Sequence, residues 1–275
     1  MLGNASHGIS VSVIAPAAYL RDFAAQDPST VHHVAAQRVL ADPEYRAFFL
    51  EEAELGAAVI VDNGVFDLGG ALPAADLVHA ARAVHAQEII LPDVMHDGPA
   101  TIRASDLAAA QILDITDEFR LCAVVHAADD REWNHVYDHF ASRDYTGSIA
   151  FPASRSREPS RELAKNRVAA TAYLEETGRV VPGLTYRLLG FGRTGHLELI
   201  AQRAHIWISS VDGAAPVLLG VMGVRMLPRG PYDKPPTPRV ERIEHIDLGR
   251  FALIRDNINT VRAAAGDPVK IRKAR

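Results

Sequence analysis

The chain has 275 residues, of which 48% are hydrophobic and 23% charged, with a formal net charge of -5 and a single cysteine, Cys122. It contains no apolar run of about 18 residues and no secretion signal at its start, so we expect a cytoplasmic protein without a membrane span. One cysteine excludes an internal disulfide and a cysteine-rich zinc site.

Apolar, β-branched runs alternate with segments of helical period along the chain. Strands are predicted at residues 10–15, 57–62, 88–93, 120–126, 147–152, 186–191 and 205–212. Helices are predicted at 77–85, 98–112, 129–140 and 248–265, and His32 and His33 lie in another helix-like segment. Residues 216–227 fit either an eighth strand or a helix, and the Pro-rich stretch 230–239 predicts an irregular connection.

Repeated β-then-α order over this length favours a (β/α)8 barrel, with a doubly wound sheet as the alternative. We expect one barrel domain spanning 1–275, with a helical, basic tail from about residue 230 that ends in KIRKAR. In a barrel the C-terminal ends of all strands open on one face, so residues distant in sequence meet there.

Three predicted strands end in an aspartate, namely Asp62, Asp93 and Asp212. One such acid is commonly a helix cap or a turn residue. Three at corresponding positions also fit an active site, in which one carboxylate is the nucleophile and another exchanges protons. His126 ends the strand at 120–126 and would share their rim, as a ligand contact or a turn residue.

The charges are unevenly distributed along the chain. Residues 1–150 carry 8 Lys and Arg against 22 Asp and Glu, whereas residues 151–275 carry 21 against 12. This asymmetry fits either a basic face for a polyanion or an uneven spread of solvated charges. A basic run follows the strand at 147–152 and is either a phosphate clamp or a solvated helix face: Arg155, Arg157, Arg161, Lys165 and Arg167.

Residues Gly190, Gly192 and Gly195 match G-x-G-x-x-G, between a predicted strand and a predicted helix. A dinucleotide-binding turn is one interpretation, and a glycine-rich loop of a barrel is the other. We expect no metal site, because no H-E-x-x-H spacing is present.

Six short segments, in order over roughly residues 55–220, resemble motifs of tRNA-guanine transglycosylases. VDNGVF resembles the D-S-G-G-[FY] strand end, EIILPDV the strand with the second aspartate, and ISSVDGAAP the strand end with the nucleophile. CAVVHAADDREW, SIAFPAS and YRLLGFG stand where the family has G-I-V-Q-G-G, I-G-G-L and Y-L-M-G-V-G. His126 stands in place of a base-reading glutamine, and Ala150 and Phe151 replace glycines.

The resemblance is greatest to the shorter, DNA-directed branch known from phages and bacterial modification clusters. It implies a barrel without the zinc subdomain, which agrees with the single cysteine, and exchange of guanine in DNA for a 7-deazaguanine such as preQ0 or preQ1, without a cofactor. The implied partners are DNA and the free base, in a bacterial or phage-infected cytoplasm. The alternatives are a tRNA-directed enzyme, an NAD(P)-dependent oxidoreductase, and a non-catalytic nucleic-acid-binding subunit.

The resemblance also implies a role for individual residues. Asp212 would be the nucleophile, Asp62 the general acid/base, and Asp93 the acceptor for the N–H edge of the base. The residues implied to contact the base are Phe66, His126, Ala150, Phe151, Leu189 and Gly190, and those implied to contact the nucleic acid are Arg155, Arg157, Arg161, Lys165 and Arg193.

Overall fold

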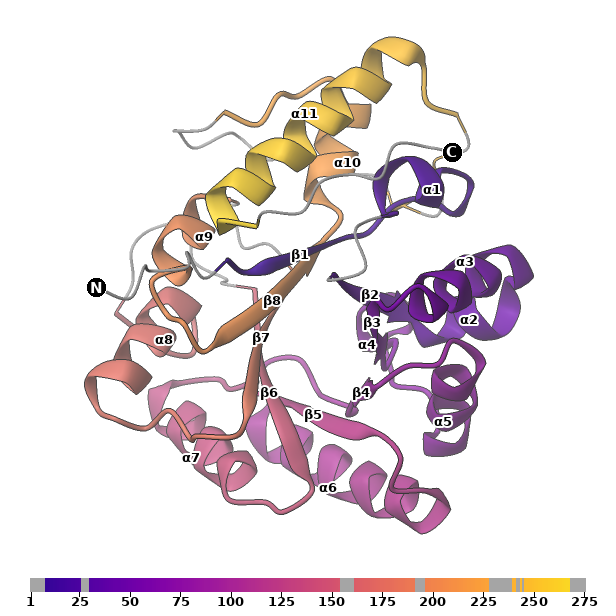
Figure 1. The fold of residues 1–275 in the computed structure, drawn as a ribbon. Coiled ribbons are helices and arrows are strands. Elements are labelled where there is room, and N and C mark those ends of the chain that lie inside the picture. Colours follow the sequence, from indigo (N-terminus) through magenta and orange to yellow (C-terminus); the bar gives the residue numbers. More distant parts are fainter. Residues whose placement is uncertain are drawn as a thin grey trace, which may run out of the picture.

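Eight parallel strands form a nearly closed barrel with helices around its outside (Figure 1). This is a computed structural model that describes residues 8–25, 30–153, 161–190, 196–227, 239–240, 243 and 245–267. The order around the sheet is β1-β8-β7-β6-β5-β4-β3-β2. The predicted (β/α)8 barrel is therefore confirmed, and the sheet does not have the reversed strand order of a dinucleotide-binding Rossmann fold.

The strands are short and alternate with helices. They are β1 (Ser10–Val13), β2 (Val31–Ala35), β3 (Ala58–Asp62), β4 (Glu88–Ile90), β5 (Arg120–Val124), β6 (Thr146–Pro152), β7 (Thr185–Leu189) and β8 (Ile208–Gly213). The longer helices are α3 (Pro43–Glu54), α5 (Ala74–Ala83), α6 (Gly98–Ile115), α7 (Asp130–Ala141), α8 (Arg167–Glu176) and α11 (Leu248–Ala265). The shorter ones are η1 (Ala17–Tyr19), α1 (Leu20–Phe23), α2 (Ala36–Ala41), α4 (Val65–Leu68), α9 (Leu197–Gln202) and α10 (Ala215–Val221).

All seven predicted strands are present, but the eighth is β2, in the segment predicted to be helical. The sequence VHHVA shows no apolar–polar alternation, because the buried histidines stand where a strand normally carries hydrophobic residues. The other candidate, within 216–227, is helix α10, which begins with a proline in its first turn.

Strands β1 and β2 meet at the seam of the barrel without a backbone ladder between them. A side chain links them instead, because the backbone N–H of His33 donates to Oγ of Ser12 at 2.9 Å. Ser12 is in turn the register partner of Asp212 in β8. The seam therefore brings β2 next to the strand that carries a predicted catalytic acid.

The barrel interior is filled below the C-terminal rim. Its middle is a buried cluster of five residues from β3 to β6: Ile60, Ile90, Cys122, Val124 and Ala150. Two residues before Ile90, and on the same face of β4, Glu88 accepts two hydrogen bonds from Arg187, at 2.6 and 2.8 Å. This buried ion pair lies below the apolar cluster, toward the N-terminal side of the interior.

Helix α11 matches its predicted bounds and packs on α10 and β1 at one side of the barrel (Figure 1). A Cβ atom at Gly220 of α10 would lie 2.4 Å from Cγ1 of Ile254, so the two helices need a glycine where they cross. Residues 230–238 of the Pro-rich stretch and the final basic residues lie outside the described part of the chain. Among the described helices, none is both long and apolar enough to cross a membrane.

Candidate active site

The three strand-end aspartates lie together at the C-terminal rim of the barrel. Asp62 is the last residue of β3, Asp212 lies one residue before the end of β8, and Asp93 follows β4 by three residues. The negative charges of Asp212 and Asp93 both raise the pKa of Asp62. The structure therefore brings together the three acids that the sequence singled out.

Asp62 has the properties of a proton-exchanging group. Burial raises its pKa to about 7, and the charges of Asp212 and Asp93 act in the same direction. A hydrogen bond at 2.8 Å from the N–H of Gly64 to Oδ1 opposes this shift. Gly64 has a φ of 85°, a conformation that favours glycine, so the Asn63-Gly64 turn holds the N–H toward the carboxylate.

Asp212 has a different environment. Burial raises its pKa to about 6, whereas the N–H of Gly190 and the positive charge of Arg167 lower it. The Gly190 N–H donates to Oδ1 at 2.9 Å. Gly190 has a φ of 67°, and this left-handed turn at the end of β7 points the N–H at the carboxylate. The carboxyl therefore ionises at a lower pH than that of Asp62.

Arg167 is a structural strut of the rim and not a phosphate clamp, which corrects one interpretation of the basic run. Its guanidinium is buried and donates to the backbone oxygens of Phe151, Leu189 and Gly190 at 3.2, 3.0 and 2.7 Å, and to Glu198. It therefore ties the ends of β6 and β7 together. No pattern in the sequence distinguished this arginine from its basic neighbours.

Asp93 is held from both sides. Its Oδ1 accepts from Nδ2 of Asn63 at 2.7 Å, and its Oδ2 lies 2.9 Å from Nε2 of His126. Asn63 is buried and also donates to the oxygen of Leu91 at 2.7 Å, while its Oδ1 accepts from the N–H of Val65 at 2.8 Å. Asn63 thus orients Asp93, a role that no motif in the sequence indicates.

His33 is a rim residue in a segment that the sequence predicts to be helical. It projects from β2 into the barrel, where its Nδ1 lies 3.7 Å from Oδ1 of Asp212. Burial lowers its pKa to about 3, and the positive charge of Arg187 adds to the effect. Its inward direction follows from the two-residue period of a strand, which places His32 and His33 on opposite faces of β2.

The residues implied to contact the base are divided between the rim and the outer layer. Phe66 lies on α4, four residues after Asp62, and is 85% exposed. Ala150 faces the barrel interior, and Leu189 packs partly buried against the same cluster. The ring of Phe151 is directed outward and stacks between Trp133 and Tyr186, on the opposite face of β6 from Ala150.

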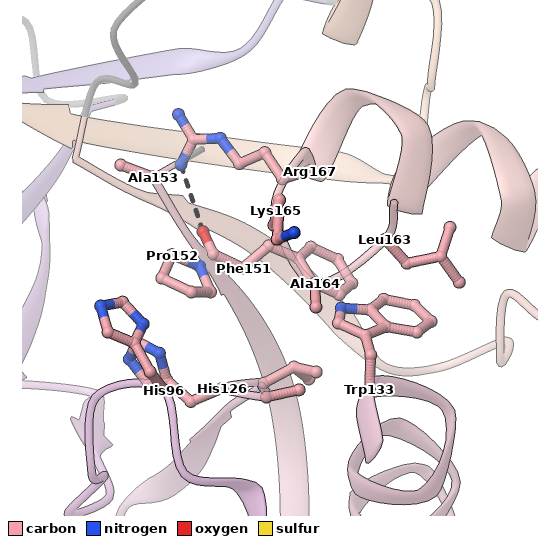
Figure 2. Close-up of a pocket in the computed structure, with 12 residues that line it drawn as sticks. His96, His126, Trp133, Phe151, Pro152, Ala153, Leu163, Ala164, Lys165 and Arg167 are labelled. Atoms are coloured by element: carbon pink, nitrogen blue, oxygen red, sulfur yellow. Dashed lines mark hydrogen bonds between the residues drawn. The ribbon is translucent and has the colours of Figure 1, made fainter. Parts of the chain in front are cut away.

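A pocket opens beside His126, between the ends of β5 and β6 and helices α7 and α8 (Figure 2). His96 and His126 lie on one side of it, edge to face with ring centres 5.9 Å apart, and Trp133 lies on another. Arg167 reaches across it to the carbonyl of Phe151, as the dashed line in Figure 2 shows. The pocket therefore adjoins the Asp93–His126 pair.

Two residues predicted to contact nucleic acid are described and exposed, and one of them lines this pocket. They are Arg161 and Lys165, and the latter forms an ion pair with Glu162 at 2.6 Å. Arg155, Arg157, Arg193, Gly192 and Gly195 lie outside the described residues. Within the described ranges, no group of three or more His, Cys, Asp or Glu side chains has a metal-binding arrangement.

The sequence matches no protein-family model and no curated protein. Among solved structures, the chain is similar to CdNal from Clostridium difficile in complex with mannosamine, with a TM-score of 0.41 and 10% sequence identity. The similarity covers 76% of this chain and 70% of that chain. A likeness of this size carries no inference about chemistry, which rests on the rim residues.

Proposed function

We propose that the protein is an enzyme that exchanges guanine in DNA for a 7-deazaguanine base through a covalent intermediate on Asp212. The observation that supports this most directly is the cluster of Asp62, Asp93 and Asp212 at one rim. Their environments separate the two carboxyl pKa values, at about 7 for Asp62 and about 6 for Asp212. Such a separation is typical of an acid and a nucleophile working as a pair.

In the first half-reaction, an oxygen of Asp212 attacks C1′ of the target nucleotide as the bond from C1′ to N9 of guanine breaks. With Oδ1 held by the N–H of Gly190, Oδ2 is the attacking atom. Asp62 gives its proton to the departing guanine, so that a neutral base leaves. The result is a glycosyl ester on Asp212, as in a retaining glycosidase.

In the second half-reaction, the ionised Asp62 takes the proton from N9 of the incoming 7-deazaguanine. That nitrogen attacks C1′, and the bond from C1′ to Asp212 breaks, which regenerates the carboxylate. Asp93, fixed by Asn63 and His126, accepts hydrogen bonds from the N–H edge of each base in turn. The target nucleotide must be single-stranded or flipped from the duplex to reach the rim.

The choice of DNA over tRNA rests on the sequence. The single cysteine leaves no set of thiolates for the zinc subdomain of the tRNA-directed enzymes. The excess of basic residues in 151–275 supplies positive charge for a nucleic-acid backbone. A tRNA-directed enzyme is the second candidate, favoured by the same three aspartates.

The test is base exchange with radiolabelled preQ0 and preQ1 on single-stranded DNA, duplex DNA and tRNA in parallel. We expect label in DNA with the wild type, none with Asp212→Ala, and a covalent protein–DNA adduct on denaturing gels that requires Asp212. Asp114→Asn, on the exposed face of α6, is the matched control and should be fully active. Absence of label in DNA with the wild type, or full labelling by Asp212→Ala, would contradict the proposal, and label in tRNA alone would select the second candidate.

A further inference from the structure

The side chain of His33 is enclosed at the seam of the barrel, next to the predicted nucleophile. It is 7% exposed, and its Nδ1 faces Oδ1 of Asp212 at 3.7 Å. Its backbone N–H, not its ring, makes the structural link to Ser12 across the seam. The imidazole is therefore not required for that link, and its position calls for another explanation.

The burial of the ring determines which nitrogen carries the proton. The Nε2 atom is buried and has no hydrogen-bond partner among the described residues. A proton on Nε2 would be a buried donor without an acceptor, which is unfavourable. A proton on Nδ1 faces a carboxylate oxygen, so the Nδ1–H form is favoured.

Burial and a neighbouring charge keep the ring neutral. The loss of solvent around the ring and the positive charge of Arg187 both disfavour an imidazolium at His33. On the side of Asp212, the charge of Arg167 and the N–H of Gly190 favour the carboxylate, and Asp212 in turn raises the pKa of Asp62. His33 can therefore direct a hydrogen bond at Asp212 without neutralising its charge.

We propose that His33 is a positioning residue that donates its Nδ1–H to Oδ1 of Asp212 and, with the N–H of Gly190, holds that oxygen while Oδ2 attacks. The present separation exceeds a hydrogen bond by about 0.5 Å, and such contacts shorten when substrate occupies an active site. Two donors on Oδ1 fix the rotation of the carboxylate. This inference rests on the proposed role of Asp212 as the nucleophile.

Three substitutions separate the two ring nitrogens. His33→Asn places an amide near the position of Nδ1, His33→Gln places one near Nε2, and His33→Phe keeps a ring without nitrogen. In single-turnover formation of the DNA adduct, we expect His33→Gln and His33→Phe to be about 10–100-fold slower and His33→Asn to be within about 5-fold of the wild type. The KM for the free base should not change. His79→Phe, on the exposed face of α5, is the control.

A second measurement does not depend on activity. The 15N shifts of His33 in the full-length protein should show Nδ1 protonated and Nε2 unprotonated, with the Nδ1 signal moving in Asp212→Asn. A proton on Nε2, or equal rates for His33→Asn and His33→Phe, would overturn the inference. If the wild type exchanges no base, the proposed function fails, while the ring measurement still decides whether His33 donates to Asp212.

Discussion

His126 Nε2 lies 2.9 Å from Oδ2 of Asp93, the carboxylate whose other oxygen accepts from Asn63. Both oxygens of Asp93 are thereby fixed before any base arrives. Because the carboxylate is already held in place, less conformational entropy is lost when a base binds. Removal of one of these contacts should therefore weaken base binding more than it slows the reaction.

The first prediction concerns the removal of this contact. His126→Ala should raise the KM for the free base by about 10–100-fold, because a hydrogen bond to a charged group contributes about 1.5–3 kcal/mol. Its kcat should fall much less. Steady-state exchange with varied base concentration measures both constants. His135→Ala, exposed on α7, is the control, and an unchanged KM in His126→Ala would show that Asp93 is oriented without it.

The second prediction concerns the pH profile. Asp212 must be ionised to attack, and its pKa is about 6, whereas Asp62 must be protonated to release guanine, and its pKa is about 7. The profile of kcat/KM should be bell-shaped with a maximum between pH 6 and 7, and its two apparent values belong to the coupled pair. A profile that is flat from pH 5 to 8 would contradict the assignment of these roles.

The third prediction concerns stability. The pKa of Asp62 is raised in the folded state. The contribution of its protonated form to the free energy of unfolding is therefore fully present below about pH 4 and is lost as pH rises through about 7. Asp62→Asn removes this cost and should stabilise the protein by about 1–2 kcal/mol at pH 8, with little change at pH 4. Thermal unfolding at both pH values measures the difference. An equal shift at the two values would indicate a packing effect instead.

The fourth prediction concerns Arg167 and its buried partner Glu198. Arg167→Met leaves the buried carboxylate of Glu198 without its positive partner and should lower the free energy of unfolding by about 3–5 kcal/mol. The double variant Arg167→Met/Glu198→Gln should recover most of that stability but stay at least about 10-fold less active, because Gly190 loses the donor to its oxygen. Denaturant unfolding and base exchange on the same preparations separate the two effects. Recovery of full activity by the double variant would remove Arg167 from the positioning of Gly190.

Much of the fold was predictable from the sequence. The apolar runs before Asp62 and Asp212 mark strands that are buried on both sides, and β-α alternation predicts that their ends share a face. In contrast, β2 was missed because its central residues are His32 and His33, whose burial depends on partners in β8 and α3. The hydrophobic pattern of residues 31–35 carries no information about those partners.

The site was predictable to the extent that it lies at strand ends. Asp62, Asp93, Asp212 and His126 are all at the rim, as strand termini in a barrel require. The roles of Arg167 and Asn63 could not be predicted, because a residue that orients another side chain belongs to no recognisable sequence motif. The two-residue period of β6 points the ring of Phe151 outward and Ala150 inward, so the two residues cannot contact a ligand from the same face.

Below the rim, the apolar cluster and the Glu88–Arg187 pair fill the described interior of the barrel, and their side chains are almost fully buried. This leaves the rim as the approach to the candidate site. For an exchange reaction, the departing and incoming bases must therefore use the same opening, one after the other. The proposed enzyme would then follow ping-pong kinetics, with guanine and the 7-deazaguanine competing for one form of the protein, the glycosylated one.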